Sequence, residues 1–342
     1  YCMEYMSLNL ADLAFGVAAM AGMSGGATFE TMLTNQFGSI AFTFLFIFIC
    51  CLIIRGGIKD GIEKFNKIGM PALFVMLVIV IARAVTLPGA GEGLNFMFAP
   101  NWEPFTSLDG FLKVLSAAGG QMFFSLSLAM GITVTYGSYL SKKESLVRNS
   151  MLIIISDTLV AVMAGMAVLP AAFALGGGES AALSGPKLLF ITLQDVFNSM
   201  GPFGPIFGIL FVLFVVLAAI TSAIALTEVL VTFVIDLRIA RGKEPKRNTV
   251  VAVICLVLFA EAAVVAADGL GANGLLVPFQ STGRDLGSCW LEFMDFISEG
   301  VAMPLGALIM SVLIGWVVGP QAIRDEVSLE GHQMSKGLYT FF

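Results

Sequence analysis

Apolar residues along this chain are grouped into blocks of about 20, separated by charged residues or by clusters of glycine and proline. A helix rises about 1.5 Å per residue, so a block of this length crosses the roughly 30 Å hydrocarbon core of a bilayer. The pattern therefore predicts eight membrane-spanning helices. Their expected ranges are 1–23, 39–54, 69–87, 119–140, 149–175, 203–236, 248–267 and 293–318.

Composition supports a membrane protein with many spans. Of 342 residues, 58% are hydrophobic and 12% are charged, against about 45–50% and about 25% in soluble proteins. Five cysteines without paired spacing and one histidine, His332, indicate neither a disulfide framework nor a metal site of these residue types. No basic run indicates a nucleic-acid surface. We therefore expect an all-α integral membrane protein whose partner is the lipid bilayer and not nucleic acid.

Basic residues are concentrated in alternate loops. Of the 18 lysines and arginines, 14 lie near residues 55–67, 142–148, 238–247 and 320–336. The positive-inside rule places these loops in the cytoplasm, which implies the plasma (inner) membrane as the location. The remaining long loops, 88–118, 176–202 and 268–292, then face outward. The first two are rich in glycine, proline and aromatic residues, which is typical of either simple connectors or lids over a pathway.

Polar side chains inside the apolar blocks are the candidates for function, because such groups are costly within a bilayer. Hydroxyl groups often only hydrogen bond to a carbonyl of their own helix. Glu228, Glu261 and Glu299 are most simply interpreted as structural hydrogen-bonding groups at helix contacts. Asp157 is different, because no lysine or arginine lies in its span to pair with it. A bound cation would resolve that cost.

The block 119–140 also contains a weak point for a helix. Its sequence SLSLAMG combines two serines with Gly131 at a depth where no solvent replaces a lost hydrogen bond. A helix broken in mid-membrane offers a helix N-terminus to a carboxylate and free carbonyl oxygens to a cation. Hydroxyl, carboxylate and carbonyl oxygens suit an alkali or alkaline-earth ion.

Three stretches carry a resemblance to a known family. The stretches are GQMFFSLSLAMGITVTYGSYLSKKE, AAITSAIALTEVLV, and GIEKFNKIGMPALF followed by LPGAGEGLNFMF. They resemble the neurotransmitter:sodium symporter family, in its bacterial amino-acid transporter branch. The resemblance extends from the family's third span to its tenth. It implies an inverted-repeat sodium symporter fold with discontinuous helices. Residues 1–342 would form one transporter domain that lacks the first two spans and the last.

The resemblance further implies sodium-coupled symport of an amino acid by alternating access, and no enzymatic reaction. Two sodium ions would be bound, one by Ser125 and Asp157, the other by the carbonyl of Ala218 with Thr221 and Ser222. The implied substrate contacts are Tyr1, Phe124, Ser127, Met130 and Leu226. The implied gating elements are Phe124 as a lid, Asp295 at the outer gate, and a cytoplasmic hinge from Gly61 to Pro71.

Two finer expectations follow from these positions. Met130 and Leu226 in the substrate pocket favour an apolar amino-acid side chain. The carboxylate of Asp157 would supply the negative charge that chloride provides in animal members of the family, so we expect chloride independence. Departures from the family pattern are Ala129 in place of a usual glycine and Gln194 in place of a common proline. A cation channel and a non-transporting membrane scaffold or sensor are the alternative functions.

Overall fold

A computed structural model of the chain describes residues 3, 25–57, 63–141, 144–180, 190–191, 197, 204–278, 289–319 and 321. The described residues form helices and connections, without a strand among them. The chain divides into two compact units. Unit 1 comprises Tyr1–Pro100 and Val162–Phe293, and unit 2 comprises Asn101–Ala161 and Met294–Phe342.

Six helical segments in the described part are long and apolar enough to cross a membrane. Five are α3 (Gln36–Arg55), α4 (Lys64–Val85), α8 (Leu146–Ser180), α11 (Gly204–Ala240) and α12 (Arg247–Asp268). The sixth joins α13 (Trp290–Asp295), η5 (Phe296–Ala302), α14 (Met303–Val312) and η6 (Leu313–Val318). η5 and η6 are π-helical turns. These segments confirm six of the predicted spans, while 1–23 lies outside the described residues except for Met3.

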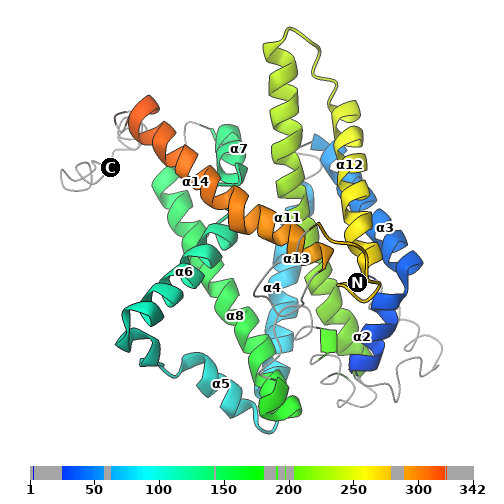
Figure 1. The fold of residues 1–342 in the computed structure, drawn as a ribbon, viewed down its shortest axis with the longest axis vertical. Helices are drawn as coiled ribbons and strands as arrows, with labels where there is room; N and C mark the ends of the chain where they lie inside the picture. Colours follow the sequence, from blue (N-terminus) through cyan, green and yellow to red (C-terminus); the bar gives the residue numbers. More distant parts are fainter. Residues whose placement is uncertain are drawn as a thin grey trace. The chain divides into compact units, whose positions relative to one another are not determined.

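Helices α3 and α12 pack together in unit 1, and α11 packs on α4 and α12 (Figure 1). Ile54, Ile224, Val231 and Val251 are buried in this core. Phe44 of α3 meets the edge of Phe259 of α12, with ring centroids 5.4 Å apart. Other apolar side chains of the same helices are exposed, such as Leu52 and Leu256. Helices that are apolar on all sides are typical of membrane spans, whose outer faces contact lipid.

The predicted loop 88–118 is largely helical in the structure, which was not expected from the sequence; whether it is a connector or a lid stays a prediction. It contains α5 (Ala90–Phe98), η2 (Glu103–Thr106) and the first part of α6 (Leu108–Ser125). Gly93 on α5 is buried against the backbone of α8, where an added Cβ would stand 2.6 Å from the carbonyl oxygen of Leu169. Phe96 and Phe173 pack with centroids 5.3 Å apart. Glycine is therefore required at position 93 for this close approach of α5 to α8.

A buried carboxylate organises the described part of loop 268–292, which has no assignment from sequence. Asp268 is 1% exposed and ends α12. Its two oxygens accept backbone N–H groups from Gly271, Leu275 and Trp290, at 3.1, 3.2 and 2.9 Å. The amide of Asn273 donates to the carbonyl of Leu33, at the end of α2 (Gly25–Thr34). The loop thus joins the ends of α2 and α12 to the start of α13.

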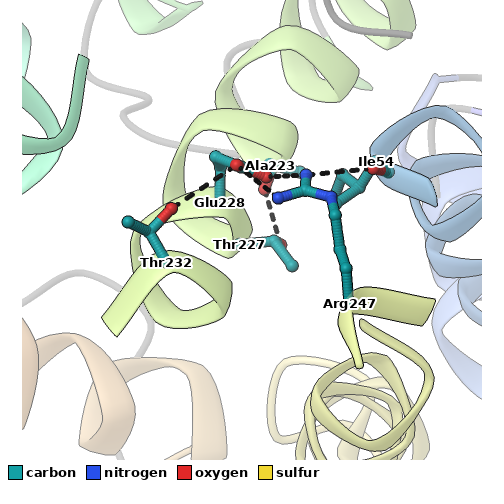
Figure 2. Close-up of polar contacts among 6 residues, drawn as sticks. All are labelled: Ile54, Ala223, Thr227, Glu228, Thr232 and Arg247. Carbon is teal, nitrogen blue, oxygen red and sulfur yellow. Dashed lines mark hydrogen bonds and ion pairs between the residues drawn. The ribbon is translucent and has the colours of Figure 1, made fainter. Parts of the chain in front are cut away.

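A second buried carboxylate, Glu228 on α11, is fully enclosed and paired with Arg247 on α12 (Figure 2). The guanidinium donates to both carboxylate oxygens, at 3.0 and 2.7 Å. It also donates to the carbonyl of Ile54, at 3.1 Å, in the last turn of α3. Last-turn carbonyls lack partners within their own helix and favour a cation. This pair therefore joins three spans, and it confirms the structural interpretation of Glu228. Glu261 is exposed.

Candidate functional site

The predicted span 119–140 is interrupted in the structure. Helix α6 ends at Ser125 and α7 (Ile132–Tyr139) begins six residues later, which leaves residues 126–131 between them, here termed the break segment. Ser127 N–H donates to Phe124 and Leu128 N–H donates to Phe123, at 3.1 and 2.9 Å. This is the pattern of a Schellman helix end, in which the residue after the cap is left-handed. The predicted helix break is confirmed.

Left-handed backbone recurs along the break segment. Ser127, Ala129 and Gly131 have φ of 53°, 63° and 77°. A residue with a Cβ pays about 1–2 kcal/mol in this conformation, whereas glycine does not. That difference gives a physical reason for the family's usual glycine at the position of Ala129. Strain of this kind persists where surrounding structure imposes it, and it is concentrated at functional sites.

The break also releases backbone acceptors. Within the described part of the chain, no backbone N–H group donates to the carbonyl oxygens of Ser127, Leu128, Ala129 or Met130. Free carbonyl oxygens at membrane depth are costly unless a ligand, an ion or water satisfies them. The segment thus presents four acceptors to whatever binds beside it.

Ser125 and Asp157 are brought together next to this segment. The hydroxyl of Ser125, the last residue of α6, donates to Oδ1 of Asp157 on α8 at 2.6 Å. Asp157 is partly buried, and no lysine, arginine or histidine in the described ranges forms an ion pair with it. The contact joins residues 32 positions apart. One neutral hydroxyl leaves most of the carboxylate's negative charge uncompensated, which favours a cation at this point.

The second predicted set lies on α11. The hydroxyl of Thr221 donates to the carbonyl of Ala218 at 2.8 Å, so these two oxygen atoms are adjacent. Ser222 is exposed at the next position. The hydrogen bond of Thr221 is the intrahelical bond that a threonine hydroxyl commonly forms in a helix without any functional role. It also leaves the lone pairs of the threonine oxygen available to an ion, so geometry alone is compatible with both interpretations.

The remaining predicted residues fall on several elements. Phe124 and Leu226 are 53% and 47% exposed, and Ser127 and Met130 lie in the break segment. Asp295 ends α13, directly before the π-helical turn η5. Pro71 lies in the second turn of α4, on its exposed side. Tyr1, Gly61 and Gln194 lie outside the described residues.

Sequence reasoning missed one buried ion-pair partner and one close contact between helices. Arg247 was assigned only to a basic loop, although it is the first residue of α12 and binds Glu228. A buried acid on one span followed by an arginine at the entry to the next is the signal that could have indicated the pair. Gly306 on α14 contacts Ala129, and nothing local in the sequence marks that contact. No cluster of three histidine, cysteine, aspartate or glutamate residues occurs in the part that the structure describes.

Comparison with known proteins agrees with this geometry. The model of the sodium:neurotransmitter symporter family matches residues 26–336. The chain belongs to this family. As a symporter family member it is a multi-pass membrane protein with the family's all-helical fold, as the resemblance implied.

Two curated relatives of this chain are named as sodium-dependent transporters. YhdH of Bacillus subtilis is 30% identical over 317 residues, which are 93% of this chain and 65% of the relative. An uncharacterized transporter of Haemophilus influenzae is 32% identical over 287 residues, 84% of this chain and 58% of the relative. The chain thus spans less than two thirds of the length of either relative.

A solved structure of the same fold contains an amino acid. The crystal structure of MhsT in complex with L-phenylalanine matches with a TM-score of 0.79 and 30% sequence identity. The match covers 99% of this chain and 72% of MhsT. The discontinuous helices and the membrane spans of this chain therefore follow the fold of MhsT.

Proposed function

We propose that the protein is a symporter that couples the entry of an amino acid to the entry of sodium by alternating access. The observation that carries this proposal is the 2.6 Å contact between Ser125 and Asp157 beside the broken helix. A carboxylate without a basic partner, a hydroxyl and free carbonyls are the ligands of a hard monovalent cation. Membership of the sodium symporter family supports sodium as that cation.

Two sodium ions are proposed as co-transported substrates. Ser125 and Asp157 would bind the first, and the Ala218 carbonyl with the Thr221 and Ser222 hydroxyls would bind the second. Each sodium ion entering with the membrane potential supplies about 2.3 kcal/mol per 100 mV. At 100 mV, two ions would supply about 4.6 kcal/mol, which corresponds to roughly a two-thousandfold accumulation of substrate before the sodium concentration gradient is added.

The amino acid would bind at the break segment. Free carbonyl oxygens in this segment suit the ammonium group of an amino acid, and the carbonyl of Ser127 is one of them. Met130 and Leu226, with Phe124 as a lid, would enclose an apolar side chain, and Tyr1 would be a further contact. The L-phenylalanine bound by MhsT supports an amino acid of this type.

Gating would follow from elements at the two ends of the pathway. Asp295 would form the acidic half of the outer gate, and Phe124 would close over bound substrate. The segment from Gly61 to Pro71 would open the cytoplasmic path, because a proline removes one helical hydrogen bond and weakens the helix before it. The basic loops are proposed to face the cytoplasm of a cell whose plasma membrane holds the protein.

Uptake into liposomes tests this proposal. The complete reading frame that encodes this chain is expressed, purified and reconstituted, and labelled L-phenylalanine, L-leucine and L-glutamate are compared. We expect accumulation of the apolar amino acids above equilibrium only with an inward sodium gradient, and little of L-glutamate. Passive sodium current without accumulation would indicate a channel. Neither current nor uptake, despite correct folding, would indicate a scaffold or sensor.

Chloride independence is a separate prediction about Asp157. Wild-type uptake should be the same when gluconate replaces chloride, because the carboxylate already supplies the negative charge. Asp157→Asn keeps the shape and removes the charge, so its uptake should be weak or should rise with chloride. The measurement is initial sodium-driven uptake at several chloride concentrations. An asparagine variant with wild-type rate and no chloride response would contradict the charge argument.

A further inference from the structure

Gly306 on α14 faces the break segment at close range. A Cβ built at this glycine would stand 3.0 Å from the carbonyl oxygen of Ala129 and 3.7 Å from its Cβ. The first distance is shorter than van der Waals contact between a carbon and an oxygen allows without movement. Both residues belong to unit 2, so the contact lies within one compact part of the chain.

We propose that Gly306 is a positioning residue for the substrate site, which rests on the function proposed above. Its missing side chain lets α14 lie against the Ala129 carbonyl and hold the break segment in one conformation. Ala129 is left-handed at φ 63° and lies between Ser127 and Met130, the two proposed substrate contacts in the segment. A displacement of the Ala129 carbonyl therefore also moves Ser127 and Met130.

The local structure of the last span agrees with this role. Glycine inside a helix costs about 1 kcal/mol relative to alanine. Nothing in the helix itself compensates for that cost at Gly306, whereas the approach to Ala129 does. The α-helix α14 in this span is ten residues long and has a π-helical turn on each side. Such turns are frequent at functional sites and adjust which side chains face inward.

The variant Gly306→Ala distinguishes an effect on the position of the break segment from an effect on protein stability. Alanine adds helix propensity, so a purely structural view expects an equal or higher melting temperature and normal transport. The proposal expects the break segment to shift by a few tenths of an ångström. For interactions that depend on close geometry, such a shift should raise the substrate KM by about five- to tenfold. The maximal rate and the amount of folded protein should change by less than about twofold.

Gly315 provides a control in the same span. It lies in η6, and nothing is within 4 Å of a Cβ built there. Gly315→Ala should therefore leave the substrate KM unchanged. A rescue variant adds Ala129→Gly to Gly306→Ala, because glycine at 129 can rotate its carbonyl away without the left-handed penalty. The substrate KM of the double variant should be at least about threefold lower than that of Gly306→Ala. If the two substitutions acted independently, adding Ala129→Gly would not lower the KM in this way.

Hydrogen–deuterium exchange gives a readout that does not require transport. Peptides that cover residues 126–131 should exchange faster in Gly306→Ala than in the wild type or in Gly315→Ala. If the wild type does not transport, the proposed function fails. The exchange result still shows whether Gly306 holds the break segment in one conformation. A wild type that transports, with Gly306→Ala unchanged in both KM and exchange, would overturn the positioning role alone.

Discussion

Sodium-driven uptake should be lost when Asp157 is replaced by alanine. The substitution removes the only carboxylate at the contact with Ser125, and the hydroxyl then has no charged partner. Removing one member of a buried charged interaction costs about 2–5 kcal/mol, so the apparent sodium affinity should fall by at least about thirtyfold and up to several thousandfold. The measurement is initial uptake across a sodium titration in liposomes. At ordinary sodium concentrations no uptake should remain.

Two variants show whether the loss comes from the proposed sodium site. Ser125→Ala removes a neutral ligand and keeps the carboxylate, so its sodium titration should shift in the same direction by a smaller amount. Asp109→Ala removes an exposed acid that pairs with Lys113 on the surface of α6, and it should behave as the wild type. Normal sodium dependence of uptake in Asp157→Ala would show that the ion binds elsewhere.

Removal of Arg247 should have the largest effect on stability. Arg247→Ala leaves Glu228, which is fully enclosed, without its ion pair and removes the donor to the Ile54 carbonyl. Breaking a buried pair in this way costs about 3–5 kcal/mol. The melting temperature of the purified protein should fall by on the order of 10 °C. Thermal unfolding in detergent, followed by tryptophan fluorescence or by size-exclusion chromatography after heating, is the measurement.

The pair itself can be isolated by a double substitution. Glu228→Met with Arg247→Met replaces both charges by apolar side chains of similar length, which is close to neutral when packing is preserved. The double variant should therefore recover most of the stability lost in Arg247→Ala. Arg241→Ala is the control, because Arg241 is exposed in the same basic loop. Equal losses in the double and single variants would show that the charge left on Glu228 is not the cause.

Most of the membrane spans could be predicted because the signal is local. A block of apolar residues long enough for the bilayer specifies a span by itself, and six predicted spans appear within a few residues of their expected ends. The break after Ser125 was also local, because serines and glycine weaken a helix wherever they occur together. The helices within 88–118 were not predicted, because glycine-rich composition indicates a loop, whereas the contact that requires Gly93 lies with the distant helix α8.

The sequence by itself determined that this chain is a bundle of membrane spans, where one span breaks, and which polar residues lie at membrane depth. Length, apolar composition and helix-weakening residues act over a few neighbouring positions, so they need no knowledge of the fold. The family resemblance had already placed Ser125 with Asp157 at one ion, and the structure shows the hydrogen bond between them. Only the tertiary structure decided that Arg247 reaches both Glu228 and the end of α3, and that Gly306 lies against Ala129. Each of these contacts joins positions far apart in the chain, and its energy exists only after the helices have packed.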